Sequence, residues 1–107
     1  DICISPVTTI EIHSALGRKL RDGDIAYETH QKAIQLWDDD FPHIIKIPFS
    51  ESLIKLAKEL IDRNGIKTLD AIQTGSAVLS LSSELVTSDR QMFKVFQSFS
   101  DRKSTFI

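Results

Sequence analysis

The sequence has very little cysteine and no long apolar run. Cys3 is the single cysteine, so an internal disulfide framework is excluded. Because Cys3 stands in a short apolar stretch, we expect it to pack as a small buried side chain. No apolar run approaches the roughly 20 residues that a membrane-spanning helix needs, and we expect no signal peptide. These absences predict a cytoplasmic protein that does not act at a membrane.

Excess positive charge, aromatic residues and phosphate-binding loops are also lacking. The net charge is −2, which excludes a generic basic coat for nucleic acid but not an enzyme whose acidic metal ligands lower the charge. With one Trp and one Tyr, no aromatic platform for stacked bases is indicated. The three histidines lack the spacing of zinc ligands. The absence of a Gly-rich phosphate loop argues against a common α/β phosphate-binding domain.

The sequence predicts strands and helices that alternate along a single domain of 107 residues. Short apolar strands are predicted over 2–5, 43–48, 84–89 and 104–107. Apolar residues at helical spacing predict helices over 8–20, 25–40, 51–63, 68–81 and 89–99. This alternation is typical of an α/β domain whose helices cover both faces of a short, mainly parallel sheet.

Polar residues and glycines mark the expected helix ends. The expected N-caps are Thr8, Asp24, Ser50, Thr68 and Asp89 (or Ser88). Glu11 completes a capping-box pattern with Thr8, and Gly23 and Gly65 are stop signals. The acidic run 38–40 is unfavourable at a helix C-terminus, so the helix there should end before or within the run.

Glu11, Asp70 and Asp89 stand at places that one edge of an α/β sheet can bring together. Mg²⁺ and Mn²⁺ prefer oxygen ligands such as these carboxylates. A bound ion of this kind can orient a phosphate and activate a water. Each acid also has a structural explanation, as a capping-box residue, a partner of the helix dipole or an N-cap. Spacing alone leaves both interpretations open.

Three segments resemble successive motifs of the PIN domain family, the metal-dependent ribonucleases best known as VapC-type toxins of bacterial toxin–antitoxin pairs. Residues 4–18 resemble the second acidic motif, residues 65–79 the third, a Leu-Asp-Ala at a helix start, and residues 85–93 the fourth, a strand ending in Thr-x-Asp. Their order and spacing agree with the family. The resemblance therefore implies a three-layer α/β/α PIN-like domain over residues 1–107.

The resemblance also implies roles for particular residues. Glu11, Asp70 and Asp89 would hold Mg²⁺ or Mn²⁺, with the polar Thr87 and Ser88 around the ligands. A metal-activated water would then attack an RNA phosphodiester.

Arg18 lies seven residues after Glu11 and could meet the substrate phosphate, although a solvated or ion-paired arginine is the simpler explanation. The partners implied by the resemblance are RNA, a second copy of the chain in a homodimer, and a small antitoxin protein that covers the site.

The sequence departs from the family in two places. Gln73 and Gly75 replace a customary His and Ala, a change expected to affect packing more than chemistry. The central strand that carries the family's first catalytic Asp is also missing before Asp1. We expect the chain to be a fragment, to exchange a strand with another copy, or to receive the strand from a separate chain. The alternative function is a catalytically inactive PIN-like interaction module.

Overall fold

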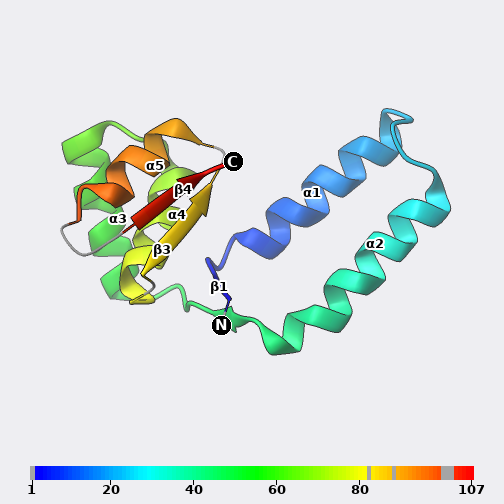
Figure 1. Cartoon of the computed structure of the whole chain (residues 1–107), viewed down its shortest axis with the longest axis horizontal. Coiled ribbons are helices and arrows are strands. Elements are labelled where there is room, and N and C mark those ends of the chain that lie inside the picture. The colour runs from blue at the N-terminus through cyan, green and yellow to red at the C-terminus, as the bar shows by residue number, and fades with distance from the viewer. Residues whose placement is uncertain (1, 82, 88, 100–102) are drawn as a thin grey trace.

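The protein is mixed α/β and mostly helical, with short parallel strands (Figure 1). The computed structural model describes residues 2–81, 83–87, 89–99 and 103–107. Its elements in chain order are β1 Cys3–Ile4, α1 Thr8–Arg21, α2 Tyr27–Asp40, the 3-10 turn η1 Phe41–His43, β2 Ile45–Lys46, α3 Glu51–Asn64, α4 Thr68–Leu79, β3 Glu84–Thr87, α5 Arg90–Gln97 and β4 Lys103–Phe106. The α/β class predicted from the alternation of elements is confirmed.

The described strands form two separate parallel pairs rather than the single sheet that the sequence predicts. In the first pair β1 lies beside β2, with Cys3 opposite Ile45. In the second β3 lies beside β4, with Glu84 opposite Lys103. Helices connect the strands of each pair, as parallel pairing requires. No described strand joins β1 to β3, so the three-layer PIN-like arrangement stays a prediction.

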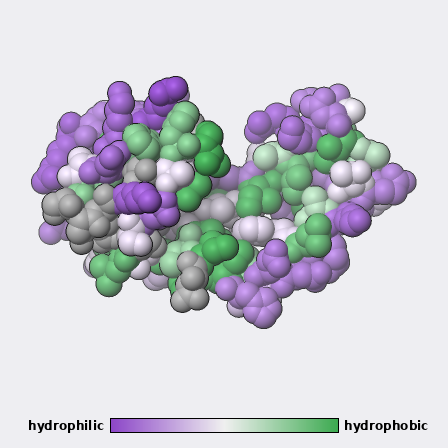
Figure 2. Space-filling model, viewed as in Figure 1, coloured by the Kyte–Doolittle hydropathy of each residue, from purple (hydrophilic) through white to green (hydrophobic). Residues whose placement is uncertain are grey.

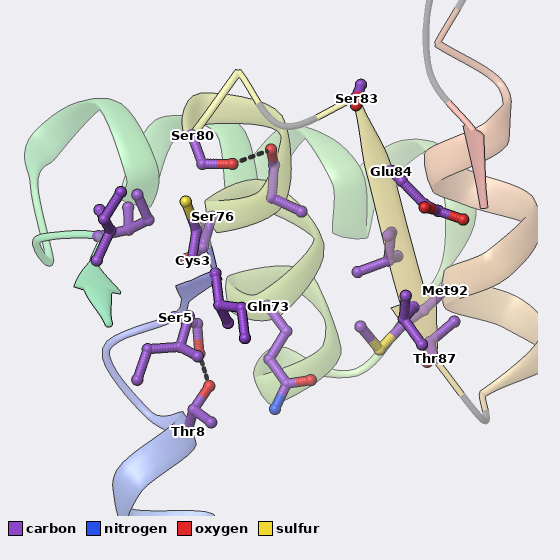
Figure 3. Close-up of a pocket in the computed structure, with 17 residues that line it drawn as sticks. Cys3, Ser5, Thr8, Gln73, Ser76, Ser80, Ser83, Glu84, Thr87 and Met92 are labelled. Atoms are coloured by element: carbon purple, nitrogen blue, oxygen red, sulfur yellow. Dashed lines mark hydrogen bonds between the residues drawn. The ribbon is translucent and has the colours of Figure 1, made fainter. Parts of the chain in front are cut away.

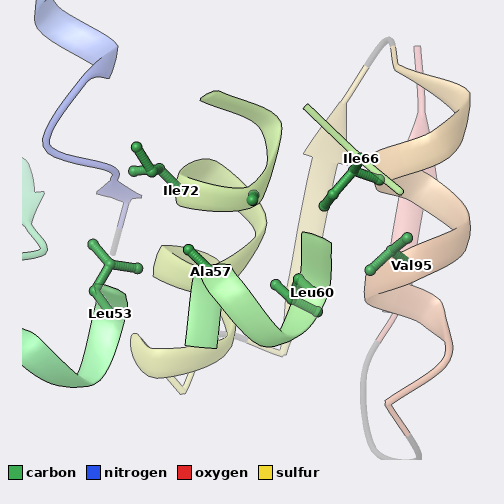
Figure 4. Packing of buried hydrophobic residues seen from close by; sticks show 7 residues of the cluster. Leu53, Ala57, Leu60, Ile66, Ile72 and Val95 are labelled. Carbon is green, nitrogen blue, oxygen red and sulfur yellow. The ribbon is translucent and has the colours of Figure 1, made fainter. Parts of the chain in front are cut away.

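The core lies where α3, α4 and α5 meet (Figure 4). Leu53, Ala57 and Leu60 form the buried stripe of α3, at the helical spacing of four and three residues. They contact α4, whose Gly75 allows close approach. A Cβ at Gly75 would lie 3.1 Å from Leu53 Cδ1, tighter than ordinary van der Waals contact. The small residues of α4 therefore set the distance between the two helices.

Helices α1 and α2 form a hairpin that projects from this core (Figure 1). Neither helix has a buried residue. They contact each other, and Trp37 Nε1–H donates to Thr9 Oγ1 at 3.2 Å. The radius of gyration is 15.1 Å, against about 13 Å for a compact chain of this length. The hairpin thus makes the molecule elongated.

Several of the expected helix ends are confirmed. Ser50 Oγ accepts from the Leu53 N–H at 3.2 Å and caps α3. Gly65, at φ 64°, ends that helix in the left-handed conformation that glycine favours. Gly23, at φ 77°, makes the turn after α1.

Other expected helix ends are wrong. Thr8, Asp24 and Thr68 are not N-caps, because the helices start after Val7, Ala26 and Lys67. The Thr8 hydroxyl bonds instead to Ser5 Oγ at 3.0 Å.

Helix α2 runs through the acidic run 38–40 as far as its last residue. There Gln35 Nε2–H donates to Asp39 Oδ1 at 2.8 Å, a local bond that offsets part of the unfavourable charge. Within the described part of the chain, no helix combines the length and apolar character needed to cross a bilayer.

Candidate functional site

Asp70 and Asp89 interact electrostatically. Asp70 stands in the first turn of α4, and Asp89 stands between β3 and α5, both half-buried. Burial raises the pKa of Asp70 above its usual value, and the negative charge of Asp89 raises it further, while Lys67 lowers it. The fold therefore places two carboxylates close enough to repel each other, although they are 19 positions apart in the sequence.

Hydrogen bonds fix the position of Asp89. Its Oδ1 accepts from the Met92 N–H at 2.8 Å and so caps α5. Its own N–H donates to Thr87 Oγ1 at 3.0 Å. Thr87 thus orients the loop that carries the carboxylate. Ser88, the other polar residue predicted near the ligands, lies outside the described residues.

Glu11 is connected to the same helix as Asp70. It lies in the first turn of α1, and its Oε1 accepts a hydrogen bond from Gln73 Nε2–H. Gln73 stands three residues after Asp70, and residues at this spacing share a face of a helix. The expectation that Gln73 affects packing more than chemistry therefore overlooked a polar contact with one of the candidate acids. Its spacing from Asp70 is the signal that could have revealed this.

Arg18 is not brought to this cluster. It lies seven residues beyond Glu11 on α1, which is about 10 Å along the helix axis. Its side chain is exposed, and α1 runs away from the core in the projecting hairpin (Figure 1). The described structure therefore gives no support to a contact between Arg18 and a phosphate held at the acids.

The donor chemistry of Asp70 and Asp89 fits a hard divalent cation. Mg²⁺ usually binds one or two carboxylates and keeps several waters. Two carboxylates that repel each other match this ligand number, because a bound cation would offset their repulsion. Among the described residues, however, no group of three His, Cys, Asp or Glu side chains is gathered as a set of ligands. Glu11 is engaged by the Gln73 amide instead. The described residues thus supply two carboxylates, and Glu11 is connected to the helix of Asp70 through Gln73.

A groove of about 800 Å³ is lined by Gln73, which contacts Glu11, and by Thr87, which contacts Asp89 (Figure 3). Strand β1 and strand β3 form its two walls, and α4 forms its floor with Gln73, Ser76, Ala77 and Ser80. Gln73 therefore faces both the groove and Glu11. The groove separates the two strand pairs described above.

Comparison of the chain with protein-family models, with characterised proteins and with solved structures found no match. The resemblance to PIN domains thus rests on the three sequence motifs, and it stays a hypothesis.

Proposed function

We propose that this chain is a PIN-like, metal-dependent endoribonuclease that hydrolyses RNA phosphodiester bonds. The observation that carries the proposal is the raised pKa of Asp70, which is caused first by burial and then by the negative charge of Asp89. Perturbed carboxylates of this kind concentrate at functional sites. A divalent cation would offset the repulsion between the two carboxylates. Binding such a cation is a role that the capping of α5 by Asp89 does not explain.

Under this proposal the acids have distinct tasks. Asp70 and Asp89 would hold Mg²⁺ or Mn²⁺. Thr87 orients Asp89, because the Thr87 hydroxyl accepts a hydrogen bond from the Asp89 backbone N–H. When bound, the cation would lower the pKa of an attacking water and orient the phosphate. Glu11, held by Gln73, is the third acid and would accept a hydrogen bond from the water or from a hydrated ion.

The decisive experiment compares cleavage of a mixed RNA panel by the chain and by Asp70→Asn, with Mg²⁺ or Mn²⁺ added. Asp62→Asn is the matched control, because Asp62 is an exposed acid near the end of α3. We expect Asp70→Asn to abolish metal-dependent cleavage and Asp62→Asn to retain it. Equal cleavage by wild type and Asp70→Asn would contradict the proposal.

The alternative is a catalytically inactive PIN-like interaction module. It is favoured by the lack of three gathered metal ligands among the described residues. Under either proposal the partners would be a second copy of the chain and a small antitoxin protein. Exposed apolar residues of the α1–α2 hairpin, namely Ile10, Tyr27 and Leu36, support such contacts. Folded protein that cleaves no RNA with either cation would favour the alternative.

A further inference from the structure

The guanidinium of Arg90 lies over the ring of Phe106, with its Cζ 4.6 Å from the ring centroid. Arg90 is the first residue of α5 and directly follows Asp89. Its side chain is exposed, and in the part of the chain that the structure describes no carboxylate pairs with it. The face of the guanidinium that points away from the ring is therefore open to a ligand.

Neighbouring residues hold the Phe106 ring in place. The ring packs edge-to-face on Phe93, with the centroids 6.1 Å apart and the planes at 80°, an arrangement that aromatic rings favour. Phe106 is the last residue of β4 and lies opposite Thr87 of β3. Ile107 N–H donates to the Thr87 carbonyl at 2.9 Å. Phe106 is 41% exposed, so it supports Arg90 at the surface.

The Arg90–Phe106 pair lies beside the candidate metal acids. The hydroxyl of Thr87, the residue opposite Phe106, accepts from Asp89 N–H at 3.0 Å. The Cα atoms of Asp89 and Arg90 are about 3.8 Å apart, because the two residues are consecutive. Figure 1 shows the carboxyl ends of β3 and β4 together at one edge of the core, next to the start of α5. The pair is therefore at the edge that carries Asp89.

Positive charge and apolar surface meet at this edge. Arg90 follows Asp89, and the positive charge of Lys67 acts on Asp70. Basic side chains neutralise the phosphates of a nucleic acid, whereas a planar side chain offers a surface for its bases. Figure 2 shows apolar side chains gathered where β3 and β4 end. The edge therefore offers separate contacts for the two parts of a nucleotide.

We propose that Arg90, backed by Phe106, is a stacking platform for an unpaired RNA base beside the acid pair, an inference that rests on the proposed ribonuclease function. The open face of the planar guanidinium would stack on the base, and the Phe106 ring would stabilise the cation from the other side. A base inside a duplex is already stacked on its neighbours, so the substrate class is single-stranded RNA. Such stacking accepts every base, with modest preferences set by stacking strength.

The contact between Arg90 and Phe106 also has a structural explanation, since it ties the start of α5 to the end of β4. The composition does not indicate a platform, because the sequence has one Trp and one Tyr and the planar surface comes from an arginine. Base binding must therefore be separated from phosphate binding and from stability.

The test measures binding of a fluorescent single-stranded RNA of about six nucleotides to the 107-residue chain, by anisotropy without added divalent cation. A second RNA has the same backbone but abasic sugars. Every protein in this assay carries Asp70→Asn, which removes one repelling charge and, under the proposed function, the ability to cleave the probe. Arg90→Lys keeps the charge and removes the planar face. We expect it to weaken binding of the base-bearing RNA about tenfold and to leave binding of the abasic RNA and the Tm nearly unchanged.

Further variants test the role of the ring. Phe106→Trp keeps an aromatic face behind the guanidinium and should retain binding, whereas Phe106→Leu removes that face and should weaken binding of the base-bearing RNA. Arg63→Lys is the matched control, because Arg63 is an exposed arginine in the last turn of α3. It should change the affinity for neither RNA.

Three results would overturn the inference. The first is no binding of the base-bearing RNA at about 1 mM. The second is unchanged affinity for both RNAs in Arg90→Lys. The third is an equal loss for both, which would show that Arg90 contacts phosphate and not a base.

Cleavage is measured separately, with proteins that retain Asp70. Base-dependent binding through Arg90 without any cleavage would refute the proposed ribonuclease and leave the platform. Cleavage by the wild type, together with unchanged binding in Arg90→Lys, would refute the platform and leave the ribonuclease. The two failures are therefore distinguishable.

Discussion

Replacing Asp89 with Asn and with Ala separates its two interactions. The carboxylate caps α5 through the Met92 N–H, and its charge raises the pKa of Asp70. Asn retains a capping oxygen but not the charge, whereas Ala retains neither. Loss of an N-cap typically costs about 1 kcal/mol. For a domain of this size, that lowers the Tm by about 5 °C.

The effect of Asp89→Asn on Asp70 has a definite sign. Because the folded chain holds the Asp70 proton more tightly than the unfolded chain, the raised pKa gives stability that is present below the ordinary pKa of an aspartate. That stability is lost as the pH rises through the raised value. Removing the charge of Asp89 lowers the pKa of Asp70. The pH range over which the folded protein loses this stability then becomes narrower. The contribution of burial, which is the larger cause, remains.

NMR titration of the Asp70 carboxyl and thermal unfolding at neutral pH measure the two effects. We expect a lower pKa of Asp70 in both variants and a clear loss of Tm in Asp89→Ala alone. An Asp70 pKa that is unchanged in Asp89→Asn would refute the interaction between the carboxylates. Equal loss of Tm in both variants would refute the capping argument.

Three further predictions concern the core, a cap and the site. Leu53→Ala removes a fully buried side chain and should cost about 2–5 kcal/mol in denaturant unfolding, while Leu81→Ala, at a residue that is 82% exposed, should change stability little. Ser50→Ala deletes the cap of α3 and should lower the free energy of unfolding by about 1 kcal/mol, a loss that Ser50→Asp should not show. Gln73→Ala removes the hydrogen bond to Glu11 and should lower the rate of RNA cleavage while leaving the Tm nearly unchanged. An unchanged cleavage rate would show that Gln73 has no role in the site.

Local sequence signals predicted the elements well. Ser50 and Gly65 mark both ends of α3 as expected, because capping depends on residues within one helical turn. The prediction of Thr68 as the N-cap of α4 was wrong, because Lys67 is the N-cap and Thr68 is the first helical residue. Such shifts of one residue depend on tertiary contacts that a cap pattern does not contain.

Contacts between distant segments could not be predicted in the same way. The acids Asp70 and Asp89 were predicted from motifs, but the burial of Asp70 and the charge of Asp89, which both raise the pKa of Asp70, depend on how β3 and α4 are placed. The bond from Gln73 to Glu11 joins residues 62 positions apart. The spacing of Gln73 from Asp70 places it on the same helix face, but it does not identify Glu11 as its partner. The separation of the strands into two pairs also depends on long-range placement.

The most direct measurement of the central claim is a titration of the chain with Mn²⁺, followed by paramagnetic broadening of NMR signals. If Asp70 and Asp89 hold the cation, signals of both residues and of Glu11 should broaden first, and Asp70→Asn should prevent this. The acidic run 38–40 is an internal control, since its three carboxylates lie on the projecting hairpin. Broadening that starts at this run and is unaffected by Asp70→Asn would contradict the account.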